Sequence, residues 1–66
     1  MKIIIANHGT AKGLSQEHGG TVQPVNRENV REGYAVSLPV TLKEFHRNIY
    51  PVMSPDQQTA VLRRNQ

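Results

Sequence analysis

Ser15, Glu17 and His18 come closest in this sequence to a set of catalytic side chains. They are the residue types of a nucleophile, an orienting carboxylate and a general base, which together can activate a hydroxyl for attack. The three stand almost side by side in a glycine-rich stretch, and such neighbours lack the preorganised geometry that this chemistry requires. A chain of 66 residues also rarely encloses a substrate. We therefore expect a protein that is not an enzyme and that binds no small-molecule substrate.

Histidines are the other candidates for chemistry, because the chain contains no cysteine. His8, His18 and His46 form no close pair in the sequence, and zinc bound without cysteine needs three or four converging histidine or carboxylate groups. The glycine-containing segment His8–Gly13 follows an expected strand, as a phosphate-binding loop would. It has neither the Walker spacing nor the dinucleotide-binding spacing. We expect separate loop or surface histidines, no bound metal and no cofactor.

Basic and aromatic side chains are better suited to binding a macromolecule. The formal net charge is +3, and Arg63-Arg64 is the only basic run. This balance permits a partner that is either nucleic acid or an acidic protein surface. Arginine offers five donors for phosphate or carboxylate, and tyrosine is a common anchor in protein interfaces. We expect these residues to contact a partner: Lys12, Arg27, Arg31, Tyr34, Tyr50, Arg63 and Arg64.

Three stretches are predicted to be strands. Lys2–Asn7 contains three isoleucines in succession, which favours a strand covered on both faces or lying in a dimer interface. Thr21–Val25 is a second candidate, which Pro24 restricts to the edge of a sheet. In Tyr34–Leu38 large apolar residues alternate with small ones, and Pro39 ends the strand. Two or three short antiparallel strands are therefore expected.

The stretches between these strands are predicted to be loops. His8–Gly20 has glycine at four positions, which frees the backbone, although a short helical turn around Leu14–His18 is possible. Loops of this length in small domains are often functional or mobile. Asn26–Glu32 is a charged connector, which we interpret as a hairpin loop rather than a turn of helix.

Two helices are predicted in the second half of the chain. Thr41 and Glu44 have the spacing of a capping box, and Pro51 ends the helix that they begin. Its buried face should carry Leu42, Phe45 and Ile49. The second helix begins at Ser54, again with capping-box spacing, and runs to about Arg64. Arginines at its negative end would also stabilise this helix without any ligand.

Together these elements predict one small α+β domain over residues 1–66, in the order β-β-β-α-α. Residues 1–32 form a strand and loop region, and residues 33–66 form a strand-helix-helix unit. A chain this short buries a small core, and without cysteine it has no disulfide to stabilise it. We therefore expect a homodimer or a state bound to a partner.

The segment VSLPVTLKEF resembles the strand and first helix of ribbon-helix-helix DNA-binding proteins. The resemblance covers residues 31–64 and rests on Val36, Leu38, Pro39, Leu42, Phe45, Ile49 and Ser54. It implies that two chains pair their strands into a ribbon that enters the DNA major groove. The groove-facing side of the strand would then carry Arg31, Gly33, Ala35 and Ser37. Ser37 thereby joins Arg31 among the expected partner contacts.

Two functions follow from these observations. The first is a small protein-binding module, of the size of the inhibitors and accessory factors that phages and mobile elements encode, which covers a surface on a larger protein. The alternative is a dimeric DNA-binding transcriptional regulator with a ribbon-helix-helix unit. We expect a cytoplasmic protein, because the apolar run Ile3–Ala6 is too short for a signal peptide or a membrane span and cysteine is absent.

Overall fold

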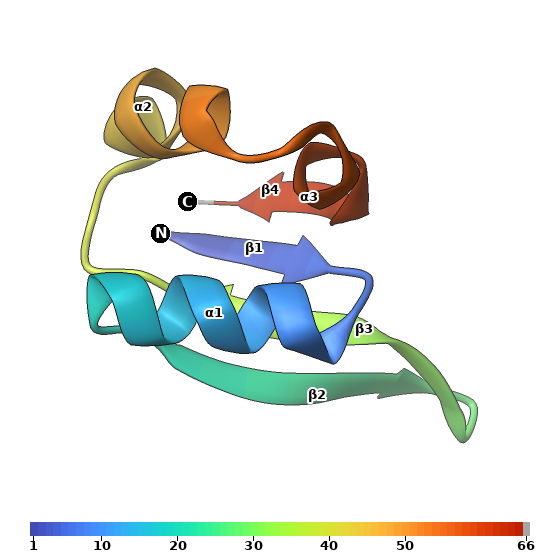
Figure 1. Ribbon diagram of the computed structural model, residues 1–66. Helices are drawn as coiled ribbons and strands as arrows, with labels where there is room; N and C mark the ends of the chain where they lie inside the picture. Colours follow the sequence, from blue (N-terminus) through green and yellow to red (C-terminus); the bar gives the residue numbers. More distant parts are fainter. Residues whose placement is uncertain (66) are drawn as a thin grey trace.

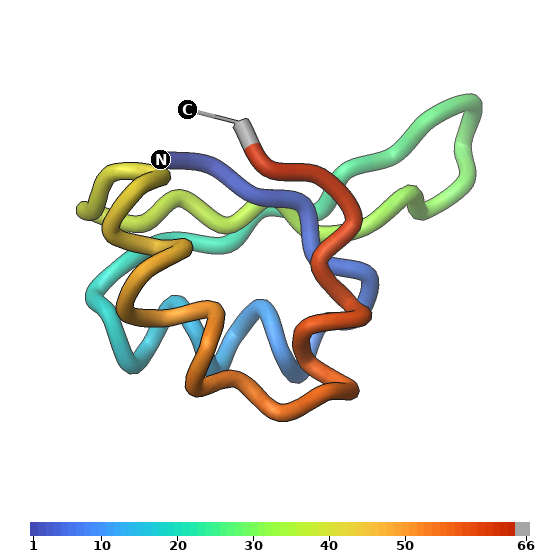
Figure 2. The backbone as a smooth tube through the Cα atoms, turned by 90° about the horizontal axis from the view of Figure 1, so that it is seen from above, coloured from blue at the N-terminus to red at the C-terminus, as the bar shows by residue number. Residues whose placement is uncertain are grey.

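The computed structural model describes residues 1–65 and has a four-stranded antiparallel sheet with helices on one of its faces (Figures 1 and 2). The strands are β1, Lys2–Ile5; β2, Thr21–Arg27; β3, Val30–Ser37; and β4, Val61–Asn65. Their order across the sheet is β2-β3-β1-β4. The predicted α+β class is confirmed, although the order of strands and helices along the chain differs from the predicted one.

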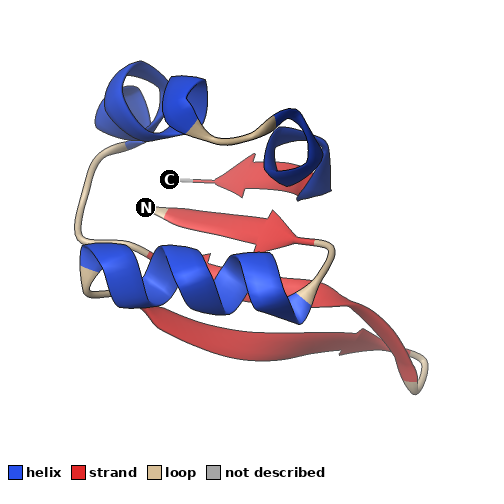
Figure 3. Cartoon of the chain, in the orientation of Figure 1, coloured by secondary structure: helices blue, strands red, loops and turns tan. Residues whose placement is uncertain are grey.

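The structure has a helix after β1 and a fourth strand at the end of the chain, which the predicted order lacks. The arrangement is therefore β-α-β-β-α-β, with β1 and β3 as the two central strands (Figure 3). The first helix, α1, follows β1, and a run of short helical segments stands between β3 and β4. This is the split βαβ, or ferredoxin-like, topology. Because that topology supports many unrelated activities, function has to be argued from particular side chains.

The strand predicted from the three isoleucines is confirmed as β1, although helices cover only one of its two faces. Ile3 and Ile5 are fully buried on the helix-covered face, and Ile4 is 5% exposed on the other face. β1 pairs with β3 on one side and with β4 on the other. Gly33 of β3 allows this close pairing, because a Cβ atom there would lie only 2.9 Å from the carbonyl oxygen of Ile5.

The loop predicted for His8–Gly20 is wrong, because most of it is the helix α1, His8–His18. The side chain of Asn7 caps its start by accepting a hydrogen bond from the Thr10 amide, at 2.8 Å. Gly19 ends it in the left-handed conformation, with φ of 72°. Interior glycine lowers helix propensity, but burial of Ala11 and Leu14 against the sheet offsets that cost.

The hairpin of β2 and β3 confirms one prediction and corrects another. β2 is an edge strand, as Pro24 predicts. The connector Asn26–Glu32, however, is mostly strand, and only Glu28 and Asn29 form the turn. Both have positive φ, 52° and 65°, which is the conformation of a type I′ hairpin turn. The local twist of this turn lets the strands continue almost to its two central residues.

The first predicted helix begins as expected but continues differently. The Thr41 side chain accepts a hydrogen bond from the Glu44 amide at 3.1 Å, which confirms the N-cap. The short α-helix α2, Leu42–Glu44, widens into a π-helical segment, η1, Phe45–Ile49, and then tightens into a 3-10 turn, η2, Tyr50–Val52. Pro51 therefore does not end the helical run at Tyr50, because η2 carries it through to Val52.

The second predicted helix is also correct at its start and wrong at its end. Ser54 and Gln57 form a complete capping box, with backbone-to-side-chain distances of 2.9 and 3.2 Å. The helix α3, Pro55–Ala60, then stops, and β4 pairs with the second edge of β1. Helix-forming residues such as Leu62 adopt a strand because β1 would otherwise leave backbone groups unpaired beside its buried isoleucines.

One core joins the helices to the inner face of the sheet. Phe45, Ile3, Ile5 and Val36 are its largest fully buried side chains, and Leu38, Ile49 and Met53 pack around them. The opposite face of the sheet is not covered by any helix of the described residues (Figure 2). Within residues 1–65, no helix is long and apolar enough to span a membrane.

Candidate functional site

Two arginine–tyrosine clusters account for half of the residues that the sequence singled out for binding. Arg31 lies against Tyr34, and Arg64 lies against Tyr50. The first pair is on β3, next to the edge strand β2. The second joins β4, at the other edge of the sheet, to the end of the helical run after α2. A histidine ring lies close to each tyrosine: His8 close to Tyr34, and His46 close to Tyr50.

The first cluster borders a shallow hollow of about 360 Å³. We call this site the Arg31 hollow, and it is lined by His8, Val22, Pro24, Arg31 and Tyr34. The rings of His8 and Tyr34 lie with their centroids 5.1 Å apart, so the first residue of α1 meets the sheet there. Val22 and Pro24 pair with Val36 and Tyr34 of β3 and supply its apolar part.

Arg31 is held in place by two hydrogen bonds to neighbouring side chains. Its Nε donates to Asn26 Oδ1 at 2.7 Å, and its Nη1 donates to the Tyr34 hydroxyl at 3.0 Å. Its guanidinium carbon lies 5.2 Å from the centre of the Tyr34 ring. A guanidinium has five N–H donors, so three remain for a ligand.

A β-bulge explains why Arg31 reaches this hollow. Val25 pairs with Gly33, but the next pair is Asn26 with Arg31, so Glu32 is an extra residue in β3. Without the extra residue, Arg31 would share the face of Gly33, which is the uncovered face of the sheet. The bulge turns Arg31 to the face of Tyr34 and leaves Glu32 on the uncovered face.

The second cluster consists of His46, Tyr50 and Arg64, and we call it the Arg64 stack. The guanidinium carbon of Arg64 lies 4.3 Å from the centre of the Tyr50 ring, which is a cation–π contact. Its Nη1 is 3.2 Å from Nδ1 of His46 and 3.4 Å from Nε2. Both contacts have the geometry of hydrogen bonds from the guanidinium, so Arg64 also directs an Nη1–H group at the imidazole of His46.

The core fixes the two rings of the Arg64 stack. The centroid of Phe45, which is fully buried, is 5.8 Å from that of His46 and 6.1 Å from that of Tyr50. Two further basic side chains, Lys43 and Arg47, stand on the same helical run and are exposed. The Arg64 stack is therefore an exposed, positively charged surface supported by a rigid base.

Arg63 does not share the surroundings of Arg64. Because neighbouring residues of a strand point to opposite faces, Arg63 lies on the uncovered face of the sheet. There it forms an ion pair with Glu32 at 2.7 Å, across the intervening strand β1. It is the one ion pair among the described residues, so within residues 1–65 no carboxylate is paired with Arg31 or Arg64. The predicted helix end for Arg63-Arg64 is wrong.

The remaining predicted residues lie apart from both clusters. Lys12 is exposed on α1, Arg27 is exposed at the end of β2, and Ser37 is exposed at the end of β3. The hydrogen bonds and ring contacts of the described residues connect none of them to the Arg31 hollow or the Arg64 stack. Their roles in binding stay predictions.

Sequence reasoning missed the histidines as parts of binding sites. His46 and Tyr50 stand one turn apart on a predicted helix, so their contact could have been found from spacing alone. His8 gave no such signal, because its meeting with Tyr34 depends on the unpredicted helix α1.

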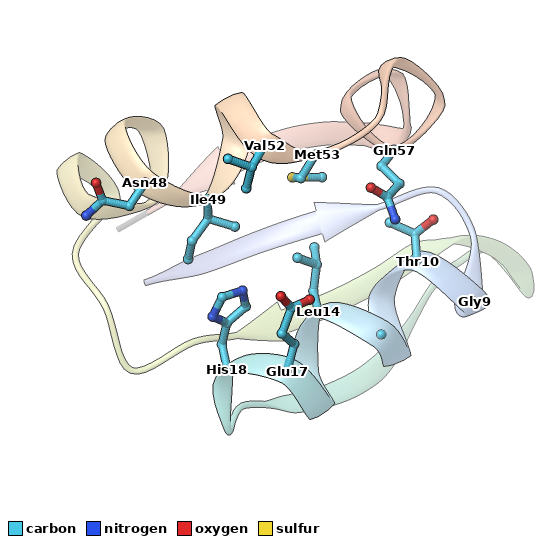
Figure 4. A pocket seen from close by; sticks show the side chains of 11 residues that line it. Gly9, Thr10, Leu14, Glu17, His18, Asn48, Ile49, Val52, Met53 and Gln57 are labelled. Carbon is cyan, nitrogen blue, oxygen red and sulfur yellow. The ribbon is translucent and has the colours of Figure 1, made fainter.

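Besides the Arg31 hollow and the Arg64 stack, a third candidate site is a groove between α1 and the helical run from η1 to α3. Its volume is about 310 Å³ (Figure 4). Glu17 and His18 point into it, opposite Asn48 and Ile49 (Figure 4). Ser15 is buried and does not line the groove. The arrangement therefore does not bring a nucleophile to Glu17 and His18. In residues 1–65, no three side chains of His, Cys, Asp or Glu gather as metal ligands would.

The ribbon that the family resemblance implies needs a strand free to pair with a second chain. In this structure β3 is hydrogen-bonded to β1 on one side and to β2 on the other. Gly33, Ala35 and Ser37 face away from the helices, whereas Arg31 is turned to the opposite face by the bulge. The four groove-facing positions of the resemblance are thus divided between two faces.

Comparison with known proteins adds no relative. No protein-family model, curated protein or solved structure matches this chain. The geometry of the Arg31 hollow and the Arg64 stack is therefore the basis for the proposals that follow.

Proposed function

We propose that this chain is a small, non-enzymatic protein-binding module that attaches through the Arg64 stack to an acidic surface of a larger protein. The observation that carries this proposal is the position of Arg64. Its guanidinium lies over the Tyr50 ring and directs Nη1 at His46, and no carboxylate of residues 1–65 is paired with it. Tyrosine and arginine are the residues that most often dominate the energy of protein interfaces.

Stacking prepares Arg64 for a carboxylate partner. His46 engages Nη1 of the guanidinium, so the donors on Nε and Nη2 remain available for a carboxylate. Because Tyr50 and His46 rest on buried Phe45, the rings lose little freedom on binding. A preorganised arginine therefore loses less conformational entropy on binding than a mobile one.

The charges around the Arg64 stack favour an acidic partner. Lys43 and Arg47 add two exposed positive charges on the same helical run. The nearby acid Glu44 is engaged at the helix start, where its carboxylate lies 3.2 Å from the Thr41 hydroxyl. Complementary charge of this kind steers association and selects partners. A standard protein interface covers about 800 Å² on each partner. That area is roughly a fifth of the 4369 Å² accessible surface of this chain, so one such interface would cover much of the surface around the Arg64 stack.

Several features support a protein partner over nucleic acid. Four-stranded sheets that bind RNA stack bases on aromatic residues of the open face. Here that face carries residues such as Lys2, Gln23, Ala35 and Ser37, and no aromatic side chain among the described residues. The alternative, a dimeric DNA-binding regulator, would need a surface other than a β3 ribbon because both edges of β3 are occupied.

Addition of a strand from a second copy is also poorly supported. Pro24 removes a backbone donor from the edge strand β2, and a register irregularity interrupts β4 at the other edge. The exposed large apolar residues Val30, Val52 and Leu62 stand on separate elements. A partner of complementary charge is therefore the better supported occupant.

Site-specific photo-crosslinking tests the proposal. A photoreactive benzoylphenylalanine is placed at Arg47, beside the Arg64 stack, or at Gln23 on the uncovered sheet face as the matched control. Both are exposed, so neither replacement should disturb the core. Irradiation in cells that carry the protein's natural partners should attach a protein to position 47 and none to position 23.

Adding Arg64→Gln to the variant with the photoreactive residue at position 47 should remove most of the crosslinked protein. Adding Lys12→Gln instead deletes an equal charge on α1 and should leave the amount of crosslinked protein unchanged. The recovered partner is then purified and its affinity measured by calorimetry with and without Arg64→Gln. Crosslinks to nucleic acid, or a product that is unchanged by Arg64→Gln, would contradict the proposal.

A further inference from the structure

We infer that the Arg31 hollow is a second binding site, separate from the Arg64 stack, and that it takes the carboxylate of an acidic peptide whose neighbouring side chain is apolar. This goes beyond the proposed function, because the two sites lie on opposite edges of the sheet and share no residue. The inference rests on three observations: an oriented arginine, two aliphatic side chains beside it, and a bulge that brings them together.

The arginine is already oriented for a ligand. Asn26 and Tyr34 take one donor each from Nε and Nη1, at 2.7 and 3.0 Å, and so restrain the side chain. The donors that remain are on the neighbouring atoms Nη1 and Nη2. Two adjacent N–H groups fit the two oxygens of one carboxylate, which is the geometry of the stronger arginine pairs. No carboxylate among the described residues occupies that position.

The rest of the hollow selects the kind of anion. Val22, Pro24 and the rings of His8 and Tyr34 contribute apolar atoms to the lining of the 360 Å³ hollow, beside a larger polar part. A phosphate dianion carries two charges, and the hollow offers it only one arginine. A monovalent carboxylate loses less hydration, and an apolar neighbour on the same peptide can cover Val22 and Pro24. An acidic residue beside an apolar one is the ligand that satisfies both parts of the hollow.

The bulge at Glu32 indicates a built site. Continuous pairing of β2 and β3 would require no extra residue, and an extra residue interrupts the ladder. Its effect is to move Arg31 from the uncovered face of the sheet to the face of Tyr34 and His8. Bulges are commonly found where a strand re-aims a functional side chain.

NMR titration of the ¹⁵N-labelled protein at low salt tests the site. The probe is acetyl-Leu-Glu-amide, and its matched control is acetyl-Leu-Gln-amide, which has the same shape without the charge. We expect the amide signals of Arg31, Tyr34 and Val22 to shift and saturate with the first peptide. The second should bind about tenfold more weakly, which is the effect of losing one charge-assisted hydrogen-bonded pair. Inorganic phosphate should produce no saturable shift at these residues.

Two variants separate the hollow from general electrostatic attraction. Arg31→Gln should weaken binding about tenfold, and Arg27→Gln, which removes the same charge from the same hairpin, should leave it unchanged. Tyr34→Phe keeps the ring and removes one of the two hydrogen bonds that hold Arg31, and it should weaken binding by a smaller factor while the spectrum stays that of the folded protein. It therefore provides a test even if Arg31→Gln perturbs the hairpin.

Three results would overturn the inference: equal binding of the two peptides, equal loss in Arg27→Gln and Arg31→Gln, or a saturable response to phosphate as strong as that to the glutamate peptide. Arg64→Gln should not affect this titration. Failure here would leave the Arg64 stack untouched, and failure of the crosslinking experiment would leave the Arg31 hollow untouched.

Discussion

Arg31 and Arg64 each lie against a tyrosine whose ring is close to that of a histidine, yet the chain holds the two arginines in different ways. Arg31 is held by hydrogen bonds to Asn26 and Tyr34 and lines a hollow. Arg64 lies over the Tyr50 ring and directs only Nη1 at His46, on an exposed surface. Hydrogen bonds from two nitrogens fix the direction of the remaining donors of Arg31, whereas Arg64 is restrained through one nitrogen and a ring contact. The first arrangement suits recognition of one small group, and the second suits a broad charged surface.

The two clusters also depend on different parts of the fold. The Arg31 hollow is set by the turn, bulge and register of one hairpin, together with the start of α1. The Arg64 stack requires β4 to pair with β1 beside the helical run that begins at Thr41. Substitutions under one cluster should therefore leave the other largely intact, provided that the domain still folds.

The largest effect is expected under the Arg64 stack. Phe45 is fully buried and touches the rings of His46 and Tyr50, so Phe45→Ala removes their support and opens a cavity. Such a substitution costs about 3–5 kcal/mol of unfolding free energy, which is comparable to the total stability of a small domain. Urea unfolding measures the loss. Phe45→Leu is the milder control, and a Phe45→Ala protein with unchanged stability would place this side chain outside the core.

The next effect is expected near the Arg31 hollow. A Cβ atom at Gly33 would lie 2.9 Å from the Ile5 carbonyl oxygen and 3.0 Å from Cγ2 of Ile4. Gly33→Ala should therefore cost about 1–3 kcal/mol through overpacking. In Gly13→Ala the new atom meets nothing within 4 Å on α1, and the variant should gain about 0.5–1 kcal/mol. Thermal unfolding of both variants gives the comparison, and a Gly33→Ala protein that is no less stable than the parent would show that the strand packing around Gly33 is looser than described.

Helix caps should contribute less. Ser54 forms a complete capping box at the start of α3, which leads directly into β4 and Arg64. Ser54→Ala should lower the unfolding free energy by about 1 kcal/mol. Thr41→Ala, at the other predicted cap, should have an effect of similar size. Calorimetric unfolding checks both, and two variants as stable as the parent chain would mean that neither cap holds its helix start.

The smallest change in stability is expected from removing the hydroxyl group of Tyr34 or Tyr50, and these variants test most directly how Arg31 and Arg64 are held. Tyr34→Phe removes the hydroxyl that accepts from Arg31, whereas Tyr50→Phe keeps the ring on which Arg64 stacks. Each should change stability by no more than about 1 kcal/mol. Only Tyr34→Phe should increase the mobility of its arginine, measured by ¹⁵N relaxation of the Nε–H groups. Equal mobility changes at Arg31 and Arg64 would remove the distinction between the two modes of support.

Local signals in the sequence were sufficient for a substantial part of this fold. Capping-box spacing located Thr41 and Ser54, and Pro24 marked an edge strand. The three isoleucines of β1 correctly indicated a strand, and all three are buried although helices cover only one face of it. Each of these signals depends on a few adjacent residues, whose conformational preferences act regardless of the rest of the chain.

Long-range packing decided the rest. α1 forms in a glycine-rich segment because Ala11 and Leu14 reach the core, and β4 forms in a helix-like segment because β1 offers an unpaired edge. Arg64 therefore meets Tyr50 through strand pairing, and the sequence spacing of these two residues gives no sign of it. Burial and backbone pairing outweigh the few tenths of a kcal/mol per residue that separate most helix propensities. Those contributions exist only once the distant segments have come together.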